Sequence, residues 1–128
     1  MVRWRGLPVF VRHRTPVEIE AARTVSIAEL PDPLARNANL PAAARASDDN
    51  RTAEGHRDWL VVVGLCTHLN CLLKDSASMG RNEASESWFC PCHAARFDSS
   101  GRVRGGPART NLPVPPLRFE GRTTLVIG

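Results

Sequence analysis

The sequence of 128 residues contains no tyrosine, a single lysine and no long apolar run. Its longest apolar stretch, residues 59–65, is far shorter than the roughly 20 residues that a membrane-spanning helix needs. The start of the sequence also lacks the apolar segment and the small-residue cleavage site of a secretory signal. With 42% hydrophobic and 23% charged residues, we expect one soluble globular domain with a single core.

The net charge is also small, because 17 basic residues are offset by 13 acidic ones, which gives a formal net charge of +4. The arginines are scattered among the acids. A nucleic-acid-binding protein would gather them on one face with aromatic residues between them. We therefore expect no nucleic-acid partner, and a surface that is solvated or docks on another protein.

Short runs rich in β-branched and aromatic residues, bounded by Gly, Pro, Asn or Asp, predict strands. They are residues 8–14, 23–27, 59–63, 87–90, 95–98, 117–120 and 123–127. This pattern is typical of an antiparallel all-β domain. The all-apolar residues 60–63 predict a strand that is buried on both faces.

One short helix is expected over residues 16–22. Thr15 and Glu18 have the spacing of a capping box, and Pro16 occupies the first helical position. Residues 31–57, rich in Ala, Asn, Asp and Pro, show no sustained period. A segment of that length is unusual in a small domain, so we predict an excursion or a partner-binding surface.

All four cysteines and two of the four histidines fall in two groups. The first is C-T-H-L-N-C at residues 66–71, and the second is C-P-C-H at residues 90–93. Both follow predicted strands, so we expect them on loops of a rigid sheet, where binding groups are commonly found. This concentration of thiol and imidazole groups predicts a metal or redox site.

The possible kinds of metal centre can be compared by counting the available ligands. Six groups exceed the four that one tetrahedral zinc takes, and neither group has the Cys-x2-Cys spacing of a zinc ribbon. Four thiolates alone would leave the histidines unused. A binuclear iron–sulfur cluster that takes one cysteine and one histidine from each loop uses every group, provided that the remaining cysteines pair. A structural zinc module stays as the alternative.

The pair C-T-H-L-x-C and C-P-C-H resembles the two cluster-binding loops of Rieske [2Fe-2S] proteins. Residues 2–19, 58–69 and 98–115 extend the resemblance to nearly the whole chain, which is similar to the bacterial iron–sulfur subunits of ubiquinol–cytochrome c reductase, the cytochrome bc complex. The resemblance implies one [2Fe-2S] cluster per chain, with the ligands Cys66, His68, Cys90 and His93. It also implies a disulfide between Cys71 and Cys92.

The resemblance implies an all-β antiparallel sandwich with a base fold at about residues 1–63 and 111–128. A cluster-binding subdomain would be inserted at about residues 64–110. The function would be one-electron transfer from a quinol to a c-type cytochrome, with cytochrome b and cytochrome c1 as partner subunits. His93, with His68 beside it, would hydrogen-bond the quinol and couple proton transfer to electron transfer. This domain is not expected to catalyse quinol oxidation without its partner subunits.

The implied disulfide places the protein in an oxidising compartment, which in a bacterium is the periplasmic side of the inner membrane. The resemblance also implies an N-terminal membrane anchor that would precede residue 1 in the full-length protein. Membrane association would then depend on that anchor.

Five more residues are expected to shield or tune the cluster: Leu69, Ala95, Phe97, Gly106 and Pro107. Leu69 would be an apolar lid or a packing residue, and residues 106–107 would lie in a covering loop. Ala95 and Phe97 stand where respiratory members carry serine and tyrosine hydroxyls that donate to cluster sulfurs. Each missing donor should lower the potential by something on the order of 50–100 mV.

We therefore expect a variant with a lowered redox potential. The missing donors also suit a Rieske subunit of another oxidoreductase, such as arsenite oxidase, which is the alternative reading. The sequence departs from the family further at Asn70 and Ala94, where glycine is usual, and at Arg109, where proline is usual.

Overall fold

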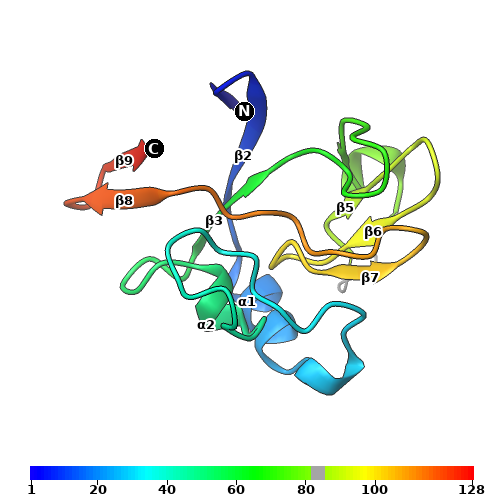
Figure 1. The fold of residues 1–128 in the computed structure, drawn as a ribbon, viewed down its shortest axis with the longest axis horizontal. Coiled ribbons are helices and arrows are strands. Elements are labelled where there is room, and N and C mark those ends of the chain that lie inside the picture. Colours follow the sequence, from blue (N-terminus) through cyan, green and yellow to red (C-terminus); the bar gives the residue numbers. More distant parts are fainter. Residues whose placement is uncertain (82–85) are drawn as a thin grey trace.

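The computed structural model describes residues 1–81 and 86–128, and its strands form antiparallel sheets as predicted (Figure 1). The first sheet has the order β1-β2-β3, with β1 Val2–Trp4, β2 Leu7–His13 and β3 Trp59–Val63. The second has the order β4-β5-β6-β7, with β4 Lys74–Asp75, β5 Trp88–Phe89, β6 Arg96–Phe97 and β7 Val103–Gly105. The third is the hairpin of β8 Leu117–Glu120 and β9 Thr124–Ile127.

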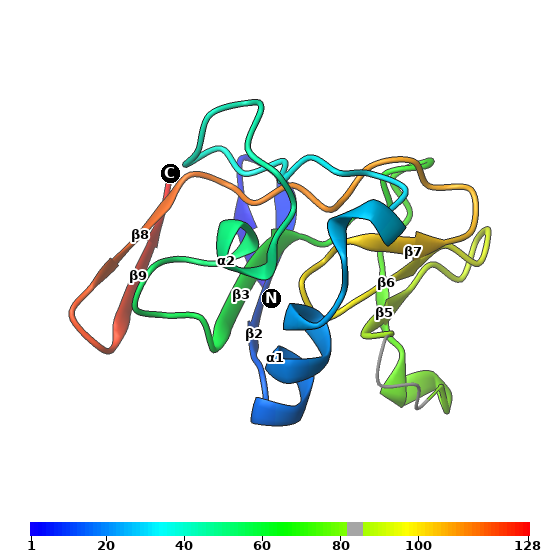
Figure 2. The same cartoon turned by 90° about the horizontal axis from the view of Figure 1, so that it is seen from below.

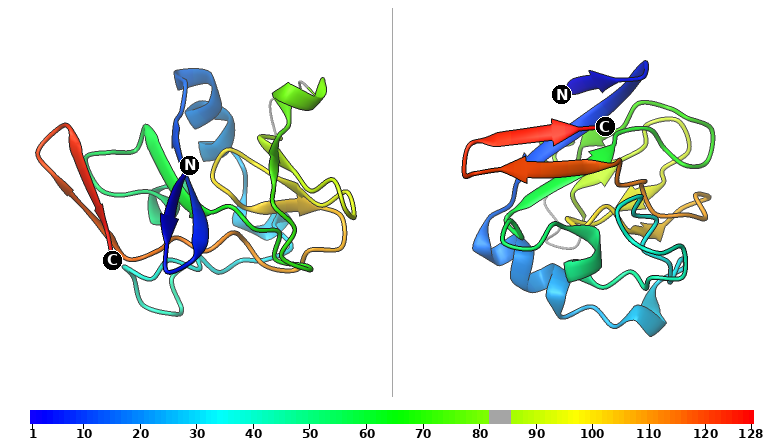
Figure 3. Two further views of the ribbon diagram at one scale, coloured as in Figure 1. Left: turned by 90° about the horizontal axis from the view of Figure 1, so that it is seen from above. Right: turned by 60° about the vertical axis from the view of Figure 1, so that its left-hand side comes forward.

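The four-stranded sheet and the β8–β9 hairpin lie at opposite ends of the molecule, with the three-stranded sheet between them (Figures 1 and 2). The segment before β8, drawn in orange, runs back along the molecule from β7 to the hairpin (Figures 1 and 3). On the way it pairs with β3, because the Val63 N–H donates to the Pro113 carbonyl at 2.9 Å. The four-stranded sheet is therefore connected to the rest of the fold along two lengths of chain.

Strand β3 is buried along almost its whole length, which confirms the prediction from its apolar sequence. Leu60 and Val62 belong to one continuous hydrophobic core that extends into the four-stranded sheet. That core includes Phe97 and two of the cysteines, Cys66 and Cys90. The cysteines are thus packed into the main core of the protein.

Helix α1 covers Pro16–Arg23 and begins with the predicted capping box. The Glu18 N–H donates to the Thr15 hydroxyl at 3.2 Å, and the Thr15 N–H donates to the Glu18 carboxylate at 3.0 Å. Beyond the single predicted helix, the structure has a four-residue helix α2, Asp48–Arg51, and the short 3-10 turns η1 Ile27–Glu29 and η2 Ala77–Met79. In the described part of the chain no helix combines the length and apolar content needed to cross a membrane.

The strand predicted over residues 23–27 is wrong. Helix α1 continues to Arg23, and the Thr24 hydroxyl donates to the Ala21 carbonyl at 3.0 Å to close its last turn. Ser26 then caps η1 by accepting from the Ala28 N–H at 3.3 Å. Local hydrogen bonds to hydroxyl side chains therefore outweigh the β propensity of the apolar residues.

The prediction that residues 31–57 form an excursion is wrong, because the segment packs on the rest of the fold; the alternative of a partner-binding surface stays a prediction. Ala35, Ala46, Asp48 and Arg51 are each less than 5% exposed. The segment has no apolar period because two of these buried side chains are charged and contact other buried polar groups. It therefore forms part of the base of the fold.

A network of buried charges joins this segment to the turn after β6. Arg14 binds Asp48 at 2.6 Å, and Arg102 binds Asp98 at 3.0 Å, with all four side chains nearly inaccessible. Arg102 also donates to the carbonyls of Ala22 and Ala46, at 2.9 and 3.1 Å. Buried ions are tolerated only when paired and hydrogen-bonded in this way.

Arg51 enters the same region from α2. Its guanidinium is fully buried and donates to backbone carbonyls at Ala35 (2.5 Å), Ser100 (2.8 Å) and Gly101 (3.2 Å). Burial lowers the pKa of Arg51 to about 10, so the group stays protonated at neutral pH. The Arg51 side chain therefore holds residues 100–101 against the segment of residues 31–57.

Candidate metal centre

Residues 66–71, called loop 1 below, follow β3 after two residues and close as a tight turn. The Cys66 N–H donates to the Cys71 carbonyl at 2.8 Å, and the Asn70 N–H donates back to the Cys66 carbonyl at 2.8 Å. Asn70 has a φ of 59°, in the left-handed region that asparagine tolerates better than most residues. At this position, where the resemblance implies glycine, the sequence therefore has a residue that fits the left-handed backbone.

Residues 90–95, called loop 2 below, connect β5 to β6 and repeat that turn. The Cys90 N–H donates to the Ala95 carbonyl at 2.8 Å, and the Ala94 N–H donates to the Cys90 carbonyl at 2.9 Å. Ala94 has a φ of 64°, which is more costly for alanine than for asparagine. Cys66 and Cys90 therefore occupy equivalent positions in the two loops.

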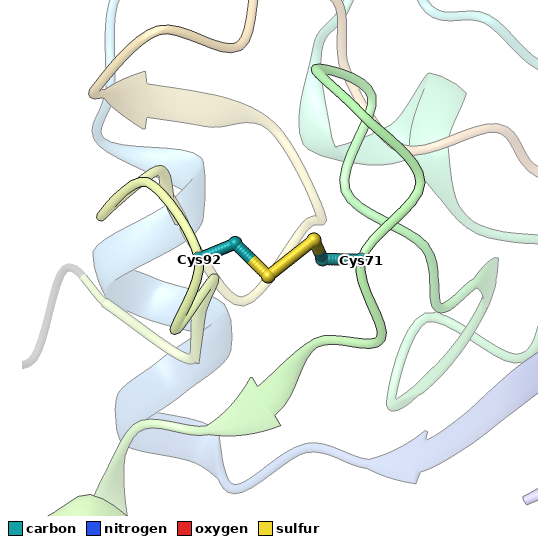
Figure 4. Close-up of a disulfide and its surroundings, with 2 residues drawn as sticks. All are labelled: Cys71 and Cys92. Atoms are coloured by element: carbon teal, nitrogen blue, oxygen red, sulfur yellow. A yellow bond between two sulfur atoms is a disulfide. The ribbon is translucent and has the colours of Figure 1, made fainter.

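A disulfide between Cys71 and Cys92 joins the two loops, as Figure 4 shows. Their Cα atoms are 6.6 Å apart, and they are separated by 21 residues in sequence. Cys71 is half-buried and Cys92 is exposed, so the bond lies toward the surface. It fixes the distance between the two turns.

The four residues predicted as cluster ligands form an inner and an outer pair. Cys66 and Cys90 are free thiols and are fully buried. His68 and His93 are exposed, and their rings lie edge to face with 4.7 Å between centroids. Each loop thus contributes one buried sulfur and one exposed imidazole.

This donor set fits a [2Fe-2S] cluster held by two thiolates and two imidazoles. Burial raises the pKa of the Cys66 thiol, and its contact with the Cys90 thiol raises it further. The backbone N–H groups of His68 and Leu69 hydrogen-bond the Cys66 sulfur and work in the opposite direction. Buried thiols with oriented amide donors are suited to becoming metal-bound thiolates, because the metal charge then compensates theirs.

The residues predicted to shield the site surround loop 2 and the tip of loop 1. Leu69 is 62% exposed, so it is not a core packing residue. Gly106 has a φ of 82°, and a Cβ built there would lie 2.5 Å from the Cα of Ala95. Pro107 follows it and is exposed. The turn at residues 106–107 therefore lies directly against the backbone of loop 2.

Ala95 and Phe97 are both completely buried in the core that contains Cys66 and Cys90. Phe97 pairs with Trp88 in the register of β5 and β6. One residue separates each of them from loop 2. Both positions therefore present hydrocarbon, where the resemblance implied hydroxyl donors.

Sequence reasoning missed one contact of the site. The Thr67 hydroxyl donates to the Thr110 carbonyl at 2.7 Å and so ties loop 1 to the segment after residues 106–107. A threonine between two ligating residues gave no sign of this partner, which is 43 positions away in sequence.

Comparison with known proteins gives one consistent family. The profile of the Rieske [2Fe-2S] domain matches residues 41–116, which include both loops. The iron–sulfur subunit of ubiquinol–cytochrome c reductase from Cereibacter sphaeroides is 45% identical over 127 residues, 99% of this chain and 66% of that protein. The subunit of the same name from Rhodospirillum rubrum is 46% identical over 127 residues, 99% of this chain and 62% of that protein.

A solved chain of a hyperthermophilic respiratory Complex III is 33% identical, covers 61% of this chain and 50% of its own, and has a TM-score of 0.46. The chain belongs to the Rieske [2Fe-2S] domain family. It spans slightly less than two thirds of the length of these curated relatives.

Proposed function

We propose that the chain is the electron-transfer head of the iron–sulfur subunit of a cytochrome bc complex. It would pass single electrons from a quinol to a c-type cytochrome, in a complex with cytochrome b and cytochrome c1. Relatives that are 44–46% identical over almost all of this chain are named as ubiquinol–cytochrome c reductase iron–sulfur subunits, which supports this assignment.

The observation that carries the proposal is the separation of a buried sulfur pair from an exposed imidazole pair on two matching loops. The cluster ligands would be Cys66, His68, Cys90 and His93. When bound, the cluster supplies a one-electron acceptor whose potential is raised by histidine ligation. The core around Cys66 and Cys90 excludes water from the sulfur side.

The exposed histidines provide the proton chemistry. An imidazole can hold or release a proton near neutral pH, and the ring of His93 is accessible from outside. It can therefore hydrogen-bond a quinol hydroxyl and receive its proton, with His68 at the neighbouring position. Leu69 and Pro107 are exposed apolar residues that would limit water around these rings.

We further propose the division of the chain into a base, residues 1–63 and 111–128, and a cluster-binding subdomain, residues 64–110. The four-stranded sheet lies within the second range, and the other two sheets lie outside it. In the full-length protein this head would be anchored at the periplasmic side of the bacterial inner membrane.

The direct test is electron paramagnetic resonance of the iron-loaded chain after reduction with dithionite, together with redox titration against pH. We expect a spectrum of a histidine-ligated [2Fe-2S] cluster and a potential that falls as pH rises, because reduction is coupled to proton uptake at the histidines. A His93→Cys variant should change both the spectrum and the pH dependence. Material with iron but a pH-independent potential up to pH 10 would contradict the assigned histidine ligands.

A lowered redox potential is part of this proposal, because Ala95 and Phe97 offer no hydroxyl to the cluster sulfurs. Ala95→Ser and Phe97→Tyr should each raise the potential by something on the order of 50–100 mV, since a donor near sulfur favours the more negative, reduced state. Protein-film voltammetry of the two single variants and the double variant measures this. Phe89→Tyr, at a half-buried aromatic position on β5, is a matched control that should leave the potential nearly unchanged.

The same missing donors suit a Rieske subunit of another oxidoreductase, such as arsenite oxidase, as a second candidate. Copurification from the native membrane distinguishes the two. Recovery with cytochrome b and cytochrome c1 supports the first candidate, and recovery with a different large subunit supports the second.

A further inference from the structure

Sulfur atoms from three of the four cysteines lie close together between the loops. The Sγ atoms of Cys71, Cys90 and Cys92 all lie within 4.8 Å of one another. The Cys66 thiol lies outside this group and contacts the Cys90 thiol. The disulfide accounts for two of these sulfurs, and the proposed cluster would use the other two.

A mononuclear zinc site has closely similar dimensions. With Zn–S bonds of about 2.3 Å in a tetrahedron, neighbouring sulfurs are about 3.8 Å apart. After reduction, the sulfurs of Cys71 and Cys92 would separate from bonding distance to about 3.8 Å, and the Cys90 sulfur would approach each of them by about 1 Å or less. The two loops already hold them, because the equivalent turns direct one sulfur each from Cys66 and Cys90 into the core.

We propose that, when the Cys71–Cys92 disulfide is reduced, the four cysteines bind one zinc ion as a tetrathiolate site. The disulfide then acts as a metal-selectivity device, because its formation removes two of the four thiolates. The zinc site rests on the sulfur geometry alone. Its consequence for cluster assembly rests on the proposed function.

The chemistry balances in two steps. An external dithiol or phosphine reductant supplies two electrons, the Cys71–Cys92 bond takes up two protons and becomes two thiols, and the reductant is oxidised. Zinc(II) then displaces four protons from four thiols to give a site of net charge −2. Four soft thiolates favour zinc over iron(II) at such a site, so reduction before cluster loading would lead to the wrong metal.

Histidines are not needed for this site. His68 and His93 lie at the surface, outside the buried sulfur pair, and their rings contact each other. This separates the proposed zinc site from a mixed site with two cysteines and two histidines, which the oxidised chain could still form.

The test is titration of the iron-free 128-residue chain with cobalt(II), a spectroscopic substitute for zinc, with and without reduction by a phosphine. We expect one cobalt per reduced chain, with the charge-transfer intensity of four thiolates, and no such signature in the oxidised chain. Cys71→Ser and Cys92→Ser should each weaken binding by at least about tenfold, since loss of outer partners alone costs 10–100-fold. Displacement by zinc should bleach the spectrum.

The double variant His68→Ala and His93→Ala is the matched control. It should keep the tetrathiolate cobalt spectrum of the reduced chain and lose the cluster spectrum of the iron-loaded chain. A second readout is the zinc content of the chain made in a reducing cytosol, measured by mass spectrometry under non-denaturing conditions. A reduced chain that binds cobalt through two sulfurs, or does not bind it, overturns the proposal without affecting the assignment of the cluster.

Discussion

The two loops have the same backbone turn, yet the rest of the molecule holds them by different means. Loop 1 is tied by a side chain, because Thr67 donates to the Thr110 carbonyl. Loop 2 is held by backbone packing, since Gly106 leaves no room for a Cβ against Ala95. Loop 2 also lies directly between β5 and β6, and β6 leads into the buried charges at residues 98–102.

This difference shows that ligand symmetry does not require symmetric support. The turn itself is a local property of five or six residues, set by two hydrogen bonds. Its position is a tertiary property, and different contacts supply it for each loop. The Cys71–Cys92 disulfide and the contact between the Cys66 and Cys90 thiols connect the two loops.

The largest effect should follow from the buried charges behind loop 2. Asp48→Asn should destabilise the protein by about 3–5 kcal/mol, because it leaves the Arg14 guanidinium buried without its anion. Asp58→Asn, in an exposed pair with His13, is the control and should cost less than about 1 kcal/mol. Urea unfolding of the two variants at pH 7 measures the difference, and equal losses would contradict the role given to the buried network.

The buried pair of Arg14 and Asp48 also predicts that the stability of the protein depends on pH. Burial works to raise the pKa of Asp48, but hydrogen bonds from Arg14 and Ser100 outweigh it and leave the pKa below its ordinary value of 3.8. The unfolded chain therefore binds the proton more tightly than the folded one, so this stabilisation is lost as the pH falls below 3.8. Hydrogen exchange in acid should increase at residues 96–105 before it increases at residues 59–63.

The next largest loss of stability should follow from removing the disulfide that joins the two loops. Cys71→Ala and Cys92→Ala should each cost about 3 kcal/mol, because the cross-link closes a loop of 21 residues in the unfolded chain. The two values should agree although one cysteine is half-buried and the other exposed. Denaturant unfolding of both variants, with wild-type protein in a reducing buffer as the control, measures this. A large difference between the two would show that side-chain packing, rather than cross-linking, dominates.

Backbone packing on loop 2 gives a somewhat smaller effect. Gly106→Ala should cost about 2–3 kcal/mol, because a Cβ would lie 2.5 Å from the Cα of Ala95 at a left-handed position. Gly121→Ala has a similar φ of 68° and open space around it, so it should cost about 1 kcal/mol. Thermal unfolding and iron content of the two variants give the comparison. Retention of full iron content in Gly106→Ala would argue against close contact with loop 2.

The smallest effect compares the left-handed residues of the loops. Ala94→Gly should stabilise the protein by about 1 kcal/mol, since alanine is strained at a φ of 64°. Asn70→Gly should change stability by only a few tenths of a kcal/mol, because asparagine tolerates this backbone. The midpoint of urea unfolding measures both. A gain of the same size at both positions would remove the distinction between the loops.

Local chemistry made some elements predictable and others not. The capping box placed α1, and apolar runs placed β3 and β8 within the correct residues. The strands β4 and β7 were not predicted, because Lys74–Asp75 and Val103–Gly105 contain charged residues or glycine and become strands only by pairing. The equally short β5 and β6 were predicted, because they contain the aromatic residues Trp88, Phe89 and Phe97. The packing of residues 31–57 on the rest of the fold was not predicted, because buried groups such as Asp48 and Arg51 are charged, and a charged residue is expected at the surface unless its partner is known.

By itself, the sequence determined the set of donors and the turns that carry them, because the spacing of cysteine and histidine within each loop is a local property. It also determined which strands are apolar enough to form the core. Only the tertiary structure decided that two sulfurs face inward while two imidazoles face outward, and that three buried arginines have partners. Those outcomes depend on contacts between residues far apart in sequence. Such contacts contribute to the free energy of folding only after the chain has brought the groups together.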